Sequence, residues 1–363
     1  ETGDIFFAES DRDWILDGAA VHVSMIGFDD GSTKDLLLDG KPVEIIHANL
    51  TSLSDTTTSK TLTVNLKICF IGTKKAGKFE IAESQAITWL RSPNTHGKPN
   101  SDVLRPWVNG NSLVTVRQQK WIVDAGVSMP LAEMAGYEKP FSHVVKFVKP
   151  DRDKNNEPRT KENYWIHKRP GPDLRAALSH LTRCVAVVRH SKHLIFSWLN
   201  TAVLPDDGIQ IFARTDDLFF GIVASRVHAA WAFAQGTQVR EKESGFRYTP
   251  QTCFEMFPFP RATPRQEAAI SAAAKDLDDL RERWLNPPEW SMIEMLEFPG
   301  SLGGPWQRYL DKKTIDQNTG IGTVRYPRLS PRDAGCAAKL KERTLTKLYN
   351  EGPAWLGLAH KRL

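Results

Sequence analysis

The chain has 363 residues, of which 40% are hydrophobic and 25% are charged, a composition typical of a folded globular protein. This length predicts about two to three domains, and the absence of any run of about 18 apolar residues excludes a membrane-spanning helix and a membrane partner. The 48 Lys and Arg residues exceed the 43 Asp and Glu residues and give a net charge of +5. This small excess is compatible with a nucleic-acid partner but does not by itself indicate one.

The four cysteines lie far apart in the sequence and form no Cys-x-x-Cys pair. A disulfide-stabilised secreted protein would contain more cysteines, and a zinc site would group them with histidines. We therefore expect reduced thiols, no metal ion and a cytoplasmic location. The first residues include no initiator Met, basic leader or cleavage site, so we expect the chain to begin within a larger structure.

In chain order, strands are predicted at 4–8 and 19–28, with a loop between them over 10–18, and at 61–70, where apolar and polar residues alternate. Shorter β-like runs predict strands at 113–116, 121–124, 143–148, 186–189, 194–199 and 209–214. Turn-rich or Ser/Thr-rich segments predict loops over 29–34 and 51–60.

Helices are predicted where apolar residues recur at helical spacing, over 172–181, 221–234, 263–284 and 330–349. The third of these has the strongest start signal, because Thr263 can cap it, Pro264 suits the first helical position and Gln266 completes a capping box. The Gly/Pro/Trp-rich stretch 286–305 predicts a linker or an irregular packed segment.

Basic residues are concentrated between 143 and 193, where twelve Lys and Arg residues accompany five acidic ones. Tyr164, Trp165 and five histidines are interleaved with these charges. Such a segment is attractive to phosphates, because each neutralised phosphate releases counterions, although a solvated basic face without a partner would look the same. The histidine spacing matches no familiar set of metal ligands. An enzyme that uses His190 or His193 for acid–base chemistry is an open alternative.

No motif in the sequence forms a complete active site. Asn286–Glu289 reads Asn-Pro-Pro-Glu, but it lacks the aromatic residue that amino-group methyltransferases need, so we interpret it as a helix stop. Gly320 and Gly322 follow a polar segment and not a buried strand, so they do not predict a cofactor loop. The acidic residues after Pro150 are too close together for a nuclease site, and there is no P-loop or nucleophile elbow. We assign no catalytic residue.

A series of segments in fixed order nevertheless resembles a known family. The segments are Ser10–Gly31 (SDRDWILDGAAVHVSMIGFDDG), Asn100–Gly110 (NSDVLRPWVNG), Trp121–Gly126 (WIVDAG), Pro140–Arg152 (PFSHVVKFVKPDR), Arg189–Leu199 (RHSKHLIFSWL), Phe212–Thr237 (FARTDDLFFGIVASRVHAAWAFAQGT) and Arg247–Pro260 (RYTPQTCFEMFPFP). Together they resemble the C-terminal part of the MmeI-like combined restriction–modification enzymes. These are DNA adenine-N6 methyltransferases with a fused target recognition domain.

The resemblance implies an α+β fold. Residues 1–47 would be remnant strands of a class I methyltransferase sheet, 48–260 a mixed α/β target recognition domain, and 261–363 a helical C-terminal segment. The nuclease, the S-adenosylmethionine loop and the catalytic motif of the family are not found here. The resemblance therefore implies that this chain holds no cofactor. S-adenosyl-L-methionine would be bound by a methyltransferase catalytic portion, in cis or in trans. The other partner would be double-stranded DNA.

The resemblance also implies individual roles. Trp14 would stack on the flipped adenine, or else would pack at the edge of the sheet. Base reading falls on the residues around the Arg-Tyr-Thr motif: Glu243, Ser244, Gly245 and Arg247. An Arg can bind guanine through two hydrogen bonds, and a Glu can accept one from cytosine, while Gly245 would make no side-chain contact. Arg247 could also be a structural residue. The residues expected to contact phosphates are Lys146, Lys149, Arg152, Lys192 and His193. Such contacts position the protein on the DNA but do not read its sequence.

Two further alternatives stay open at this stage. The chain could be a separate specificity subunit that pairs with a methyltransferase chain, or a truncated relic that folds without a function. The sequence does not indicate which DNA site would be recognised.

Overall fold

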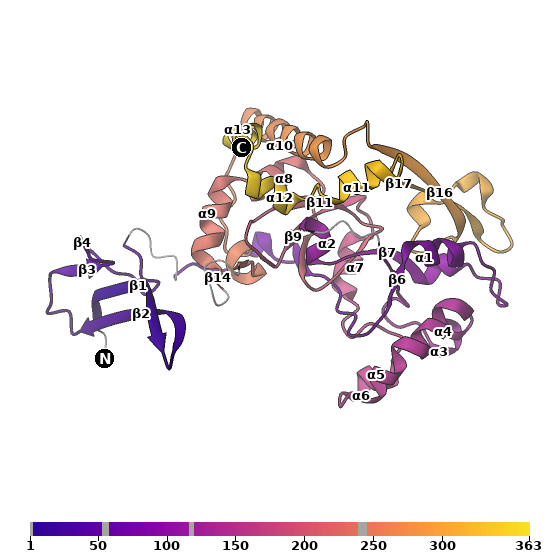
Figure 1. Ribbon diagram of the computed structural model, residues 1–363, viewed down its shortest axis with the longest axis horizontal. Helices are drawn as coiled ribbons and strands as arrows, with labels where there is room; N and C mark the ends of the chain where they lie inside the picture. The colour runs from indigo at the N-terminus through magenta and orange to yellow at the C-terminus, as the bar shows by residue number, and fades with distance from the viewer. Residues whose placement is uncertain (1–2, 53–57, 116–119, 239–244) are drawn as a thin grey trace.

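The computed structural model describes residues 3–52, 58–115, 120–238 and 245–363 (Figure 1). It contains helices and several small sheets, which confirms the predicted α+β class. Within these ranges, no helix combines the length and the hydrophobicity needed to cross a bilayer.

The N-terminal part forms a small sheet of its own, drawn apart from the rest of the molecule in Figure 1. Its strand order is β2-β1-β3-β4, and its core is small, with Ala8, Leu38 and Ile46 buried. The predicted loop over 10–18 is wrong, because the first strand continues to Leu16 and pairs with the second across a tight turn. Its polar residues face solvent, so their polarity does not prevent strand formation. The strands are β1 (Asp4–Leu16), β2 (Ala19–Asp29), β3 (Leu36–Leu38) and β4 (Lys41–Val43).

Two four-stranded sheets form the centre of the main body, in the orders β11-β9-β13-β5 and β12-β7-β8-β6. The strands predicted near 121–124, 186–189, 194–199 and 209–214 are confirmed as β8, β9, β11 and β13, which are apolar and mostly buried. The bounds are β5 (Cys69–Ile71), β6 (Glu80–Ala82), β7 (Leu104–Val108), β8 (Lys120–Val123), β9 (Arg183–Val188), β11 (Phe196–Asn200), β12 (Leu204–Pro205) and β13 (Ile209–Phe212).

Three predicted strands are wrong. The strand expected at 61–70 begins as a 3-10 turn, Thr63–Asn65, and only its end joins β5. The run at 113–116 belongs in its described part to α2 (Gly110–Val114), which Asn109 starts by a capping box. The run at 143–148 belongs to α4 (Glu138–Phe147) and its C-cap Val148, and the buried residues Pro140, Val144 and Val148 recur at helical spacing. In each case the apolar run was too short to distinguish the two-residue period of a strand from the 3.6-residue period of a helix.

The predicted helix at 263–284 is confirmed as α10 (Pro264–Leu285), and Thr263 and Gln266 form the expected capping box. The helix predicted over 221–234 is two helices, because Ser225 caps a new start after Val223. The remaining helices and short strands are α1 (Glu83–Leu90), α3 (Leu131–Ala135), α5 (Lys149–Asp153), α6 (Pro158–Glu162), α7 (Pro172–Leu178), α8 (Asp217–Val223), α9 (Arg226–Gln235), β10 (His190–Ser191), β14 (Thr237–Gln238) and β15 (Phe246–Arg247).

The stretch 286–305, predicted to be a linker or an irregular packed segment, instead contributes one strand of a long hairpin. This hairpin pairs β16 (Ser291–Ser301) with β17 (Ile321–Pro331), and α11 (Ala334–Lys341), α12 (Leu345–Glu351) and α13 (Ala354–Arg362) follow. Trp306, in the loop of this hairpin, is 1% exposed and stacks on Trp121 at a centroid distance of 5.6 Å. The C-terminal range therefore shares its core with residues before 260, and the predicted boundaries at 47 and 260 stay a prediction.

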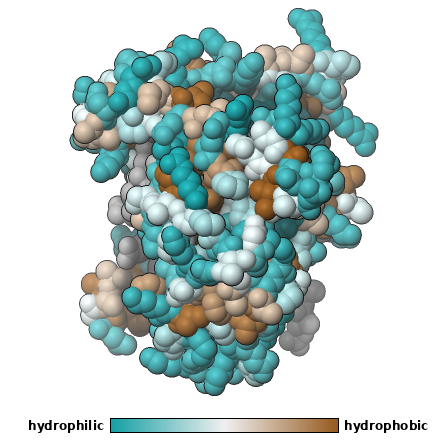
Figure 2. All heavy atoms as spheres, turned by 90° about the vertical axis from the view of Figure 1, so that its right-hand side faces the viewer, coloured by the Kyte–Doolittle hydropathy of each residue, from teal (hydrophilic) through white to brown (hydrophobic). Residues whose placement is uncertain are grey.

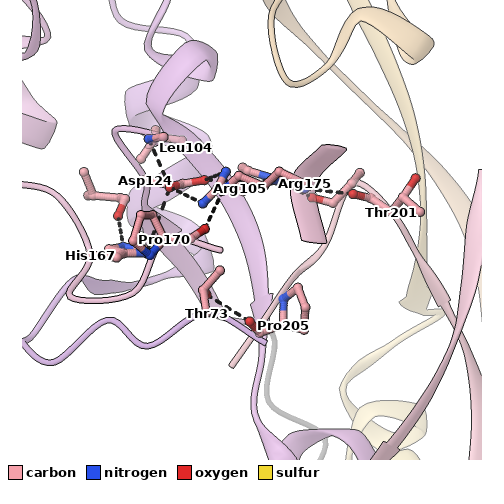
Figure 3. Close-up of polar contacts among 12 residues, drawn as sticks. Thr73, Leu104, Arg105, Asp124, His167, Pro170, Arg175, Thr201 and Pro205 are labelled. Atoms are coloured by element: carbon pink, nitrogen blue, oxygen red, sulfur yellow. Dashed lines mark hydrogen bonds and ion pairs between the residues drawn. The ribbon is translucent and has the colours of Figure 1, made fainter. Parts of the chain in front are cut away.

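A buried polar network ties the main body together (Figure 3). Asp124, just after β8, is 3% exposed and accepts hydrogen bonds of 2.8 and 2.9 Å from Arg175 of α7. Arg105 of β7 lies 3.8 Å and His167 4.0 Å from its carboxylate oxygens. Burial alone would raise the pKa of Asp124, but Arg175, His167 and Arg105 lower it below its usual range. The ionised carboxylate therefore joins β7, β8, α7 and the segment that contains His167.

Candidate nucleic-acid interface

Arg247, one of the residues predicted to read bases, lies in a small three-stranded sheet with the order β10-β15-β14, and Gly245 directly precedes its strand. His190 pairs with Arg247 and Ser191 with Phe246 across the β10–β15 ladder. Phe246 is 6% exposed and packs against Phe233 at a centroid distance of 4.9 Å. This buried ring anchors the strand and fixes Arg247 next to it. Of the predicted residues, Glu243 and Ser244 lie outside the described part of the chain.

Gly245, directly before this strand, has a conformation that few other residues adopt. Its φ angle is +100°, and a Cβ atom there would lie 2.9 Å from the carbonyl carbon of Ser191 and 3.3 Å from the amide nitrogen of Lys192. Gly245 therefore lets the two backbones approach closely. This close approach explains why a glycine occupies position 245, where the sequence analysis expected only that a side-chain contact to a base would be missing.

Replacing Gly245 by Ala should destabilise the fold by about 2–4 kcal/mol, because the positive φ and the backbone collision both oppose a Cβ atom. Urea denaturation measures this change. The matched control is Gly97→Ala, because Gly97 has a φ of +81° and a Cβ atom added there would have no atom within 4 Å. That variant should lose only about 1 kcal/mol. Equal losses in the two variants would contradict the close approach at Ser191.

Arg189 and Arg247 lie near each other at this sheet, and the Nε atoms of both are buried without a hydrogen-bond partner among the described residues. Burial lowers the pKa of Arg189, and the positive charge of Arg247 lowers it further. Burial also lowers the pKa of exposed His190, again with contributions from both arginines. Like charges held this close favour an anion or a base edge rich in acceptors.

Arg189 was missed as a candidate base-reading residue. The sequence placed it in the basic window, 58 positions before Arg247. Only the register of two short strands brings the two residues together, and no local pattern encodes that register.

The positive surface continues around the loop between β12 and β13. Asp207 there accepts a hydrogen bond of 3.0 Å from Arg169, and Lys74 lies 3.7 Å from the same carboxylate. Asp207 offsets part of the charge of Arg189, while Arg169 adds to it. Lys74 and Arg169 thus pair with Asp207, whose charge also acts on Arg189, and Arg247 acts on Arg189 from the other strand. We call Lys74, Arg169, Arg189 and Arg247 the arginine surface.

Two of the predicted phosphate contacts border this surface. Lys192 directly follows β10 and is exposed. His193 is half-buried and places Nε2 2.7 Å from Oδ1 of Asn350 in α12. His193 is therefore held by the C-terminal helices, whereas exposed Lys192 has no comparable side-chain contact in the described part of the chain.

The other predicted phosphate contacts lie elsewhere. Lys146 on α4 is exposed, and Lys149 on α5 forms an ion pair of 2.7 Å with Asp153. Figure 1 draws α4 and α5 well away from β14, so the predicted contacts form two groups and not one surface. Figure 2 shows the side of the molecule that carries these helices and the long hairpin. Hydrophilic residues cover most of it, and the hydrophobic ones form small separate patches.

The prediction that Arg152 contacts a phosphate is wrong. Its side chain is 2% exposed, and its three nitrogens donate to the backbone carbonyls of Lys75, Ala76, Thr160 and Ile166 at 2.6–3.2 Å. Its guanidinium also lies 5.5 Å from the ring centre of Phe79. Arg152 therefore holds three chain segments together, a role that its charge in the sequence did not reveal.

Trp14 lies on β1 opposite Val21 and is 43% exposed. It belongs to a strand and not to the loop that was predicted there.

Among the described residues, no group of three or more His, Cys, Asp or Glu side chains is arranged so that it could hold a metal ion.

Comparisons with known proteins give one line of support. No protein-family model matches the sequence, and no curated protein matches it. Among solved structures, the fold is similar to that of the type IIL restriction-modification enzyme MmeI in complex with DNA, with a TM-score of 0.60 and 18% identity over 79% of this chain. The match covers 39% of the MmeI chain, less than half of that protein. This chain therefore shares its fold with part of a type IIL restriction-modification enzyme.

Proposed function

We propose that this chain is the sequence-specific double-stranded DNA recognition part of a cytoplasmic adenine-N6 DNA methyltransferase of a restriction–modification system. The arginine surface carries this proposal, because it holds two half-buried guanidinium groups without a hydrogen-bond partner for Nε in the described chain. The similarity to a structure solved with DNA supports it. Methyl transfer would be performed by a catalytic portion that holds S-adenosyl-L-methionine, in cis or in trans, and Trp14 would stack on the adenine presented to it.

The direct test is selection of bound duplexes from a random DNA pool by the purified chain, at low and at physiological salt. We expect a motif of a few base pairs to be enriched and to survive the higher salt. If no motif is enriched and the affinity falls steeply as the salt concentration rises, the arginine surface binds phosphates without reading sequence.

Arg247→Gln should remove the preference for one base pair of the selected motif. Binding to the preferred duplex should weaken roughly 10- to 100-fold, because a two-bond contact between Arg and guanine contributes about 1–3 kcal/mol of discrimination. Competition binding against duplexes changed at single positions measures both effects.

Lys192→Gln is the matched control, since it removes one exposed charge beside the same sheet. It should weaken binding to all duplexes by a similar factor and reduce the slope of log affinity against log salt by about one. An unchanged motif in Arg247→Gln would exclude base reading by this residue and leave it a structural role.

A second candidate function is that of a separate specificity subunit, which pairs with a methyltransferase chain. The exposed apolar residues of the N-terminal sheet favour it. Ile15 and Leu16 are 76% and 58% exposed and follow Trp14 at one end of the β1–β2 hairpin, and Phe28 is 75% exposed at the other end. Exposed apolar side chains on one small sheet are typical of a surface that a partner covers.

If this candidate is correct, the chain should form a complex with a methyltransferase chain from the same genomic neighbourhood in sedimentation experiments. Ile15→Ser with Phe28→Ser should abolish that complex without changing the selected DNA motif. A chain that stays monomeric in the mixture would contradict the candidate.

A further inference from the structure

A cavity of about 360 Å³ lies between α2, β11, α10 and the start of α12, and the arginine surface does not line it. Its polar wall contains Arg281 and Asp278 of α10 and Ser197 of β11, and its apolar wall contains Leu113, Leu285 and Leu345. The volume lies within the range of small-molecule sites in proteins.

Arg281 is an unusual residue to find in such a wall, because it is only 3% exposed. One terminal nitrogen donates to the carbonyl of Phe196 at 2.8 Å and to Oγ of Ser197 at 2.9 Å. The other terminal nitrogen and Nε are buried and have no hydrogen-bond partner in the described part of the chain. Buried donors without acceptors cost stability, so an acceptor brought by a ligand would be bound strongly here.

Asp278 lies one helical turn before Arg281, on the same face of α10. Burial raises the pKa of Asp278 to about 6, against the opposing effect of Arg281. The two side chains make no direct hydrogen bond, because the free nitrogens of Arg281 have no partner among the described residues. The wall of the cavity thus contains a guanidinium with unsatisfied donors and, one helical turn away, a carboxylate acceptor.

We propose that this cavity binds an uncharged planar heterocycle that carries an acceptor atom beside an amino or amide donor, the chemical class of the nucleobases. The acceptor would bind Arg281, the donor would bind Asp278, and the leucines would pack against the ring. The cavity wall carries both signs of charge, since Asp278 and Glu282 repel an anion and Arg281 repels a cation placed against it, so a ligand with a neutral acceptor and a neutral donor suits both groups. The proposal does not depend on the DNA-binding function.

The test is titration of the full chain with cytosine, adenine and 2-aminopyridine by calorimetry, with thermal stability as a second measurement. We expect saturable binding of at least one of them with one site per chain. Asp278→Asn and Arg281→Met should each weaken it at least roughly tenfold, since each removes a hydrogen bond to a charged group. Asp276→Asn is the matched control on the same helix, because Asp276 is 60% exposed and lies 3.8 Å from Arg362. It should bind like the unchanged chain.

Three results would overturn the proposal: no binding of any of the heterocycles, equal binding in Asp278→Asn, or tighter binding of toluene or inorganic phosphate than of the heterocycles. Asp278→Asn decides the outcome if Arg281→Met does not fold. Duplex selection by the same preparation is measured in parallel, so that failure here is distinguished from failure of the DNA-binding function.

Discussion

Asp124→Ala should lower the free energy of unfolding by about 3–5 kcal/mol, because removing one partner of a buried ion pair leaves uncompensated charges. The side chains of Arg175 and Arg105 are 20% and 12% exposed, and both would lose their carboxylate. Asp124→Asn keeps the size of the side chain but should lose most of the same stability. Urea denaturation followed by fluorescence of the buried tryptophans measures both variants.

Glu297→Gln is the matched control, because it removes a carboxylate from an ion pair in which Glu297 and Arg325 are 52% and 55% exposed. Exposed pairs contribute about 0–1 kcal/mol, so this variant should be nearly neutral. A loss below about 1 kcal/mol in Asp124→Ala would show that the network in Figure 3 does not hold β7, β8 and α7 together.

Acidification from pH 6.5 to pH 5 should destabilise the protein by up to about 4 kcal/mol through the buried His228 and the half-buried His360. Burial lowers the pKa of His228 from 6.5 to about 3 and that of His360 to about 4. The unfolded chain therefore binds these protons more tightly than the folded chain. The folded protein is therefore most stable above pH 6.5, where both histidines are neutral in the folded and in the unfolded chain. As the pH falls from 6.5 toward the lowered pKa values of the folded protein, each histidine reduces the free energy of unfolding by about 1.4 kcal/mol per pH unit. Urea midpoints between pH 8 and pH 5 measure this slope.

Burial is the main reason why the pKa of each histidine is lowered, and each imidazole also has a tyrosine hydroxyl as its neighbour. His228 is fully buried and lies 3.0 Å from the Tyr248 hydroxyl, and His360 lies 2.8 Å from that of Tyr349. Combining His228→Gln with His360→Gln should reduce the dependence of stability on pH below 6.5, and the remainder would come from other groups such as the buried His167, whose pKa is also lowered by burial. His180→Gln, at an exposed position, should leave it unchanged. The same slope in all variants would assign the acid sensitivity to other groups.

Local sequence was sufficient for elements that local interactions stabilise. α10 was predicted with its start and its cap, because Thr263, Pro264 and Gln266 determine a helix start without help from the rest of the chain. The apolar runs of β8, β9, β11 and β13 were likewise predicted, since a strand buried in a sheet needs a continuous apolar segment.

The tertiary structure decided the candidate site. Arg152 and Lys192 carry the same kind of charge in the same window, but packing buries one among backbone carbonyls and exposes the other. The pairing of His190 with Arg247 joins strands of two residues each that have no signal of their own. The sequence by itself therefore determined the α+β class and the elements with local signals. Only long-range contacts decided which basic side chains are buried and which lie together, because burial and strand register depend on residues far away along the chain.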